Sequence, residues 1–256
     1  TNLYIVFFSF RIKISSVTGT LKDANTGLLV PVDLNAFLEK NARLISTWYF
    51  RSGDDSKGQY YKDISDRLQK SIYEVFWDEG YGSWFDYDLR NKKNRIYFYP
   101  SNLSPLWTGS YYPHDKDVFG QRAVNYLMAT GIICRDGTPR YWGIPTSLSQ
   151  SGQQWDLSNS WAPLNAFIIQ GLSYTGNNEA VYVAKKLASV WSYQNYATWK
   201  NTSYMWEKYD AVVEAAPGQG GEYAVQTGFG WSNGFFIELQ NTYRDLSPNN
   251  VKLGSC

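Results

Sequence analysis

The chain has 256 residues, 43% of them hydrophobic, and its 24 basic and 23 acidic side chains give a formal net charge of +1. This length is enough for one large domain with a substantial core, and it does not require two. The near-neutral charge gives no support for a nucleic-acid partner, and the longest apolar run, LYIVFFSF, is too short to span a bilayer.

Six segments carry apolar residues at helical spacing, and they follow one another along the chain. The first begins at Asp33, a residue type that favours the N-cap position, and stops near Gly53. The predicted helices cover residues 33–53, 60–80, 117–131, 162–176, 177–200 and 229–246. Between the second and third, residues 84–89 and 95–100 match a small β-hairpin within a loop.

The connections between these helices alternate in character. Short turns lie at 52–59 and 173–180, whereas the segments 77–109, 135–161 and 205–234 are long and rich in aromatic residues, Gly and Pro. We therefore predict an all-α array of helical hairpins whose functional face carries the long loops.

The last long segment combines residue types that seldom occur together. Residues 205–234 hold six of the chain's 21 glycines together with two Trp, two Tyr and one Phe, and aromatic residues make up 18% of the whole chain. Trp and Tyr present an apolar body with a polar tip. This composition suits both an aromatic-rich helical core and a cleft in which rings stack on sugars.

Several other site types are not expected. One histidine, His114, and no close pair of cysteines argue against a metal cluster, and nothing around His114 is typical of a nucleophile elbow. Cys134 and Cys256 are too few for a disulfide framework. We expect neither a metal nor another cofactor.

Two N-glycosylation sequons, NLS at Asn102 and NTS at Asn201, favour a secretory route. The expected location is extracellular, either secreted or anchored to the outer face of a membrane, although no span lies within this chain. The start, TNLYIVFFSF, has no basic region typical of a signal peptide, and we interpret the chain as a fragment or a processed product.

Three separated motifs give the chain a family resemblance. The segments are QWDLSNSWAP at 154–163, EKYD at 207–210 and GGEYAVQTGFGWSNG at 220–234. They resemble signature segments of the trehalases, the inverting glycoside hydrolases that split α,α-trehalose into two glucoses. The resemblance implies an (α/α)6 toroid of six inner and six outer helices, with the active site at one end.

The resemblance also assigns roles to individual residues. Glu207 matches the family's catalytic base, Glu222 a carboxylate that binds substrate hydroxyls, and Trp155 a ring that stacks on sugar, while Gln154 and Asp156 are expected to line the site. Local sequence alone favours a solvated loop acid at Glu207. Inversion needs such a base to activate a water, with a protonated carboxyl on the other side of the anomeric carbon.

The general acid of the family lies in a GWD[FY]SSRW motif upstream of PVDLNA, and this chain has no such motif. Asp23 and Asp33 do not match it, and Asp210 and Glu214 are expected to be structural. We therefore interpret residues 25–256 as the C-terminal portion of the catalytic domain, preceded by an atypical segment at 1–24. The toroid is expected to be incomplete, with uncovered apolar faces, and the acid is expected upstream.

Two alternatives remain open. One is a truncated, catalytically deficient trehalase-like protein with a sugar-binding or regulatory role. The other is a different (α/α)6 carbohydrate-active enzyme, such as a glucoamylase-like hydrolase.

Overall fold

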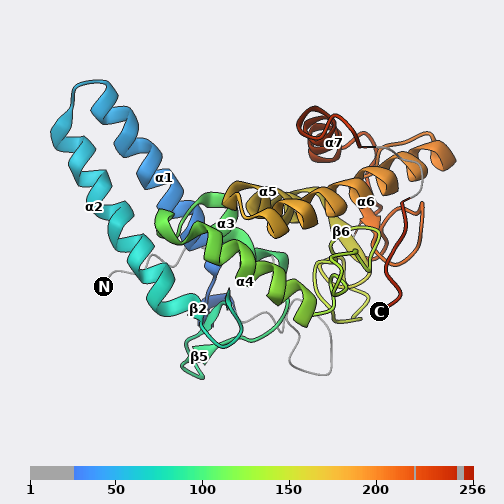
Figure 1. The fold of residues 1–256 in the computed structure, drawn as a ribbon, viewed down its shortest axis with the longest axis horizontal. Coiled ribbons are helices and arrows are strands. Elements are labelled where there is room, and N and C mark those ends of the chain that lie inside the picture. Colours follow the sequence, from blue (N-terminus) through green and yellow to red (C-terminus); the bar gives the residue numbers. More distant parts are fainter. Residues whose placement is uncertain (1–25, 222, 247–250) are drawn as a thin grey trace.

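The computed structural model describes residues 26–221, 223–246 and 251–256, and helices dominate it (Figure 1). Among these residues the α-helices are α1 (Val32–Arg51), α2 (Asp55–Ser71), α3 (Ser104–Thr108), α4 (Lys116–Ala129), α5 (Ala162–Thr175), α6 (Asn178–Thr202) and α7 (Gly230–Thr242). All six predicted helices are therefore confirmed. The short α3 was not predicted, because five residues are too few to show a periodicity.

Two helix boundaries differ from the prediction. The N-cap of α1 is Pro31, so Asp33 lies in the first turn and its prediction as N-cap was wrong. The second helix begins at Asp55 instead of residue 60, because the Asp54 side chain accepts a hydrogen bond from Lys57 N at 3.0 Å. Its end widens into the π-helical segment η3 (Ile72–Phe76).

The helices form two layers. In one layer α1 contacts α3, α3 contacts α5, and α5 contacts α7. On this layer pack α2, which contacts α1, and the neighbouring helices α4 and α6, which contact α5. The antiparallel pair α1–α2 projects at the left of Figure 1, and α7 lies alongside α5. This arrangement confirms the predicted all-α array of helical hairpins.

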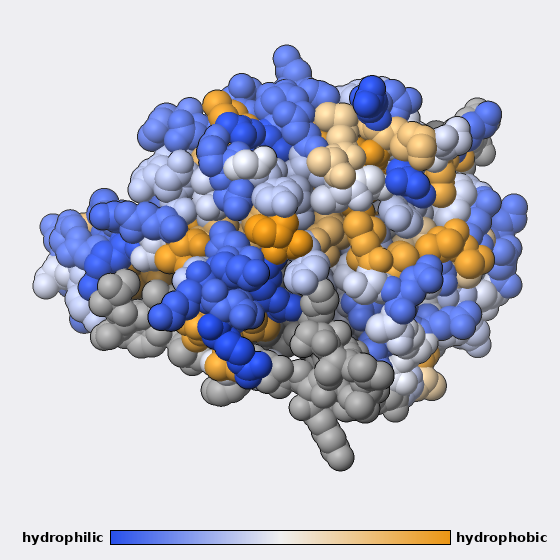
Figure 2. Space-filling view, turned by 90° about the horizontal axis from the view of Figure 1, so that it is seen from below, coloured by the Kyte–Doolittle hydropathy of each residue, from blue (hydrophilic) through white to orange (hydrophobic). Residues whose placement is uncertain are grey.

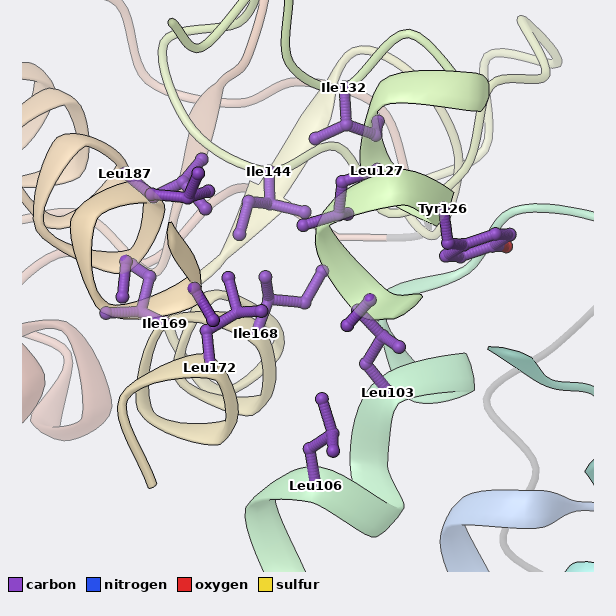
Figure 3. Close-up of a cluster of buried hydrophobic side chains, with 14 of the residues drawn as sticks. Leu103, Leu106, Tyr126, Leu127, Ile132, Ile144, Ile168, Ile169, Leu172 and Leu187 are labelled. Carbon is purple, nitrogen blue, oxygen red and sulfur yellow. The ribbon is translucent and has the colours of Figure 1, made fainter. Parts of the chain in front are cut away.

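An apolar core lies between these helices (Figure 3). Its labelled side chains come from η4 (Pro100–Leu103), from α3 to α6 and from the loops between them. They are Leu103, Leu106, Tyr126, Leu127, Ile132, Ile144, Ile168, Ile169, Leu172 and Leu187. Burying one such aliphatic side chain contributes about 1.5–3 kcal/mol, so this cluster is a main source of stability.

Short strands organise the long loops. They are β1 (Leu29–Val30), β2 (Trp77–Asp78), β3 (Ser83–Trp84), β4 (Tyr87–Asp88), β5 (Lys93–Asn94), β6 (Asn159–Trp161) and β7 (Lys208–Asp210). They pair as β1-β4-β5, β2-β3 and β6-β7. A hairpin exists here, but the prediction of its second strand at 95–100 was wrong: β5 ends at Asn94, because Asp88 accepts hydrogen bonds from Arg90 N and Asn91 N and turns the chain early.

The β6–β7 pair matters most for the site. It is antiparallel, with Trp161 opposite Lys208 and Asn159 opposite Asp210. It therefore joins the loop that follows α4 to the glycine-rich segment that follows α6.

The two cysteines form one disulfide, Cys134–Cys256, with a Cα–Cα distance of 5.7 Å and a sequence separation of 122 residues. The cysteine count alone did not predict this pair. Gly254 N also donates to Pro139 O at 2.9 Å, so residues 251–256 lie along the loop after α4. A cross-link over such a long separation stabilises the folded chain by roughly 4–5 kcal/mol in the chain-entropy account.

The surface retains apolar areas. In Figure 2 hydrophilic residues dominate the margins, and separate apolar patches cross the middle of the face. Trp48 on α1 is 61% exposed and Ile237 on α7 is 67% exposed. Whether whole apolar helix faces are uncovered, as expected for an incomplete toroid, stays a prediction. Within the described ranges, no helix combines the length and the hydropathy needed to cross a bilayer.

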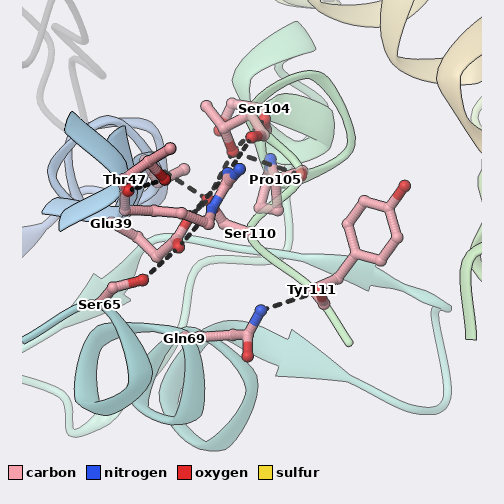
Figure 4. Close-up of polar contacts among 11 residues, drawn as sticks. Glu39, Thr47, Ser65, Gln69, Ser104, Pro105, Ser110 and Tyr111 are labelled. Carbon is pink, nitrogen blue, oxygen red and sulfur yellow. Dashed lines mark hydrogen bonds and ion pairs between the residues drawn. The ribbon is translucent and has the colours of Figure 1, made fainter. Parts of the chain in front are cut away.

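A buried carboxylate ties the first two helices to the loop after α3 (Figure 4). Glu39 is fully buried and accepts hydrogen bonds from Ser65 Oγ at 2.8 Å, Ser110 Oγ at 2.6 Å and Arg43 Nε at 2.9 Å. Arg43 Nη2 continues to Thr108 O at 2.6 Å. If the carboxylate were removed, the buried Ser65 hydroxyl would lose its acceptor, whereas Ser110 Oγ would keep Ala36 O at 3.1 Å.

We expect Glu39→Ala to lower the free energy of unfolding by about 1–3 kcal/mol, because it leaves the buried Ser65 hydroxyl without an acceptor and removes the hydrogen bonds to Ser110 and Arg43. Urea denaturation measures this loss. The matched control is Glu74→Ala, which removes an exposed ion pair to Lys70 and should cost less than about 0.5 kcal/mol. Equal losses for the two variants would contradict the assignment of Glu39 as a buried hub.

Candidate active site

A cavity of about 350 Å³ lies at the N-terminal ends of α1, α5 and α7, together with η4. Its walls combine aromatic rings with a few polar groups. The lining residues are Asp33, Leu34, Phe37, Tyr99, Pro100, Ser101, Thr146, Trp155, Trp161, Pro163, Leu164, Phe167, Tyr223 and Trp231. This size and lining are typical of a small-molecule site.

Three indoles form one wall of the cavity. Trp155 stacks on Trp161 with ring centroids 4.0 Å apart and an interplanar angle of 10°, and Trp231 meets Trp161 edge to face at 5.7 Å. Trp161 ends β6, and its indole N–H donates to Gln154 O at 3.0 Å. Pro163 then opens α5, a position that suits proline because no helical donor is lost there. The aromatic wall is therefore held in place by β6 on one side of Trp161 and by α5 on the other.

The backbone around Glu207 is held from three sides. Its N–H donates to Gln226 O at 2.9 Å, and its carbonyl accepts from Trp231 Nε1 at 2.7 Å. Tyr209 Oη accepts from Trp206 N at 3.0 Å, and burial raises the pKa of Tyr209 to about 12, which keeps its hydroxyl neutral. The position of Glu207 is thus set before any ligand binds.

The carboxylate of Glu207 is only partly satisfied. The residue is 3% exposed, and Tyr223 Oη donates to its Oε1 at 2.9 Å. Its Oε2 is buried and has no hydrogen-bond partner among the described residues. Buried polar atoms nearly always have partners, so an unpaired carboxylate oxygen indicates a place for a polar ligand. Tyr223 itself lines the cavity and links it to Glu207.

Lys208, the next residue, fastens the glycine-rich segment. Its side chain is fully buried, and Nζ donates to Gln219 O at 2.9 Å and Gly220 O at 2.8 Å. It also lies 5.2 Å from the centre of a ring of Trp161. Burial lowers the pKa of Lys208 to about 8, opposed by the nearby charge of Glu207.

The glycines of this segment permit close approach. At Gly221, where φ is +103°, a Cβ atom would lie 2.6 Å from Gln154 Oε1. At Gly220, where φ is +72°, it would lie 2.5 Å from the Gly152 carbonyl oxygen. Only glycine fits both the backbone conformation and the space.

The residues predicted from the sequence to form the site lie in different environments in the structure. Trp155 lines the cavity, and Glu207 reaches it through Tyr223. Asp156 instead accepts hydrogen bonds from Ser147 Oγ at 2.5 Å and from Ser151 Oγ, so its carboxylate braces the loop. Gln154 packs behind the wall, against Gly221. Glu222 lies outside the described residues.

Sequence reasoning missed several cavity residues. Trp161, Tyr223 and Trp231 all occur in the quoted motifs, so their aromatic character was an available signal. Asp33 lines the cavity, although its Oδ1 also accepts from Leu34 N at 2.8 Å. No sequence signal distinguished this carboxyl from a helix-terminal acid.

The remaining acidic and basic candidates have structural contacts. Asp210 Oδ1 accepts from Val212 N and Val213 N, and Glu214 accepts from the Tyr193 hydroxyl. His114 is exposed and pairs with Asp115. Within the described part of the chain, no cluster of three His, Cys, Asp or Glu side chains has the geometry of a metal site.

Known sequences that are similar to this chain identify its family. The profile of the trehalase family matches residues 3–244. Trehalase of Pimpla hypochondriaca is 41% identical over 244 residues, covering 94% of this chain and 41% of the relative. Human trehalase is 44% identical over 234 residues, covering 91% and 39%. The chain thus spans about two fifths of the length of these relatives.

The fold of this chain also resembles that of solved structures. Neutral trehalase Nth1 from Saccharomyces cerevisiae matches with a TM-score of 0.66 at 20% identity, over 88% of this chain and 40% of that one. A GH63 mannosylglycerate hydrolase from Thermus thermophilus matches with a TM-score of 0.58 at 18% identity, over 84% and 48%. These likenesses confirm the predicted (α/α)6 toroid class.

The pKa of Lys208 predicts a pH-dependent stability. Between about pH 8 and 10.5 the unfolded chain binds more protons at this lysine than the folded chain, so the free energy of unfolding rises with pH. From pH 8 to 9.5 we expect a gain of about 1.5 kcal/mol relative to Lys208→Met, measured by urea denaturation. The control variant Lys200→Met, at an exposed lysine, should show the same pH dependence of the free energy of unfolding as the unmodified protein. Parallel curves for the unmodified protein and Lys208→Met would contradict the prediction.

Proposed function

The chain belongs to the trehalase family, and we propose that its cavity is part of the active site of a glycoside hydrolase that splits α,α-trehalose into two glucoses with inversion. The observation that supports this best is the buried carboxylate of Glu207, half satisfied and joined to an aromatic cavity by Tyr223. We assign Glu207 as the general base.

In this proposal the two oxygens of Glu207 have different tasks. Tyr223 holds Oε1 and thereby orients the carboxylate. Oε2, which lacks a partner among the described residues, accepts a proton from the attacking water. Removing the base from bulk solvent strengthens its interaction with that water.

The walls of the cavity suit a sugar. Trp155 lines the cavity and stacks on Trp161, and we propose that its indole also stacks on a pyranose. Ser101 and Thr146 supply hydroxyl groups at the wall. Glu222 is proposed to bind substrate hydroxyls on the strength of the family resemblance alone. Gln154 and Asp156 contribute by holding the loop that carries Trp155.

The general acid is proposed to come from a segment upstream of the matched motifs. An inverting reaction places the two carboxyl groups about 6.5–9.5 Å apart, which leaves room for the water. The acid protonates the glycosidic oxygen while Glu207 deprotonates the water, and neither step requires a metal or another cofactor.

We also propose an extracellular location, secreted or anchored to the outer face of a membrane. The Cys134–Cys256 disulfide supports it, since such bonds persist mainly in oxidising compartments. The alternative function is a catalytically deficient protein that binds sugar or regulates a partner.

For the complete protein, Glu207→Gln should lower kcat by about 10²–10⁴-fold with little change in KM, because the isosteric amide keeps the shape and loses the base. Glucose release from trehalose measures this effect. Glu214→Gln, an acid on the same segment that bonds to Tyr193, is the matched control and should remain active.

The stereochemistry gives an independent check. Inversion releases one α- and one β-glucose per trehalose, which proton NMR resolves before mutarotation. Two α-anomers, or full activity of Glu207→Gln, would exclude the proposed role of this residue.

The 256-residue chain alone should release little or no glucose from trehalose, because the acid is proposed to lie outside it. Isothermal calorimetry should still detect weak trehalose binding that Trp155→Ala abolishes. Turnover by this chain that Glu207→Gln removes would show that its own residues include an acid. A folded chain that binds no trehalose would argue against the sugar-binding alternative.

A further inference from the structure

The two glycosylation sequons lie in opposite environments. Asn102 belongs to η4 (Pro100–Leu103), in which every residue is buried, and it is itself 1% exposed. Its Nδ2 donates to Tyr97 O at 2.7 Å and to Tyr126 Oη at 2.9 Å. A sugar on this nitrogen would replace one of its two N–H donors and would have to displace at least one acceptor and the helical turn.

The surroundings of Asn102 make that displacement costly for the whole molecule. Leu103, the next residue, belongs to the apolar core, and Ser104, which completes the sequon, is fully buried. Pro100 and Ser101 of the same turn line the cavity. A glycan here is therefore incompatible with both the core and the cavity wall.

Asn201 lies in the last turn of α6 and is exposed. Ser203, which completes this sequon, is also exposed and caps the helix with φ at +64°. The residue between them, Thr202, accepts a hydrogen bond from Trp206 Nε1 at 2.9 Å, so the turn is ordered while both sequon ends face solvent. A glycan on Asn201 displaces no described contact.

From this contrast we infer that the folded protein carries an N-linked glycan on Asn201 and none on Asn102. The inference rests on the extracellular location proposed above. The donor is a lipid-pyrophosphate oligosaccharide. The Asn201 Nδ2–C1 bond forms, the C1–O bond to pyrophosphate breaks, and the amide nitrogen gives up one proton to balance the lipid pyrophosphate that leaves.

The position gives the glycan an aromatic surface to rest on. Trp199 and Tyr204, on either side of Asn201 in the sequence, are 46% and 55% exposed. Pyranose rings stack on such faces, and their hydroxyls keep the outer side hydrated. The glycan thereby covers apolar area at the end of α6 and raises the solubility of this region.

The test uses the full chain, directed into the secretory pathway of a eukaryotic cell by an added signal peptide. Ser203→Gly removes the Asn201 sequon, and glycine suits its positive φ, so the thermal midpoint should hold or rise. Ser104→Ala removes the Asn102 sequon without losing a hydrogen bond known among the described residues. Glycopeptide mass spectrometry measures the glycan occupancy of Asn102 and Asn201. It is applied to the folded protein from cells and medium, defined as the fraction that resists protease and contains the disulfide.

We expect the unmodified chain and Ser104→Ala each to carry one glycan, with its mass lost on Ser203→Gly or on enzymatic deglycosylation. Two results would overturn the inference: an unmodified Asn201 in disulfide-bonded, protease-resistant protein, or a glycan on Asn102 in that pool. Neither result bears on the native location, which is tested separately by fractionating cells that express the complete native protein. A cytosolic outcome there would refute the location proposal alone.

Discussion

The antiparallel pairing of β6 with β7 is the constraint on which the site depends, because it joins two loops that are far apart in the sequence. Trp161 lies opposite Lys208 in this register, so the strand that ends in the aromatic wall is aligned with the strand that follows Glu207. A slip by one residue would turn every side chain of a strand to the other face. The cavity is therefore built by backbone hydrogen bonds before any substrate arrives.

Three buried charges show how the fold divides stability from function. Glu39 accepts hydrogen bonds at both oxygens and joins helices. Lys208 donates hydrogen bonds to two carbonyl groups and lies near an indole ring. Burial of its charge nevertheless lowers its pKa. Glu207 alone keeps an oxygen without a partner among the described residues. Such local exceptions to polar satisfaction are expected at functional sites.

The sequence predicted the features that depend on local patterns. Helix periodicity located all six long helices, and motif resemblance located Glu207 and Trp155 at or beside the cavity. Features that depend on distant partners could not be predicted, including the β6–β7 pair and the disulfide. The sequence also could not predict which way adjacent loop side chains point. Trp155 lines the cavity, whereas Asp156 accepts hydrogen bonds from two serines.

The stacked indoles of Trp155 and Trp161 have an optical consequence. With ring centroids 4.0 Å apart, their transition dipoles lie close enough to couple, so the absorption of each indole depends on the position of the other. That coupling depends on the mutual orientation of the two rings, both of which line the cavity. The protein therefore carries an intrinsic chromophore pair that reports on this wall without any added label.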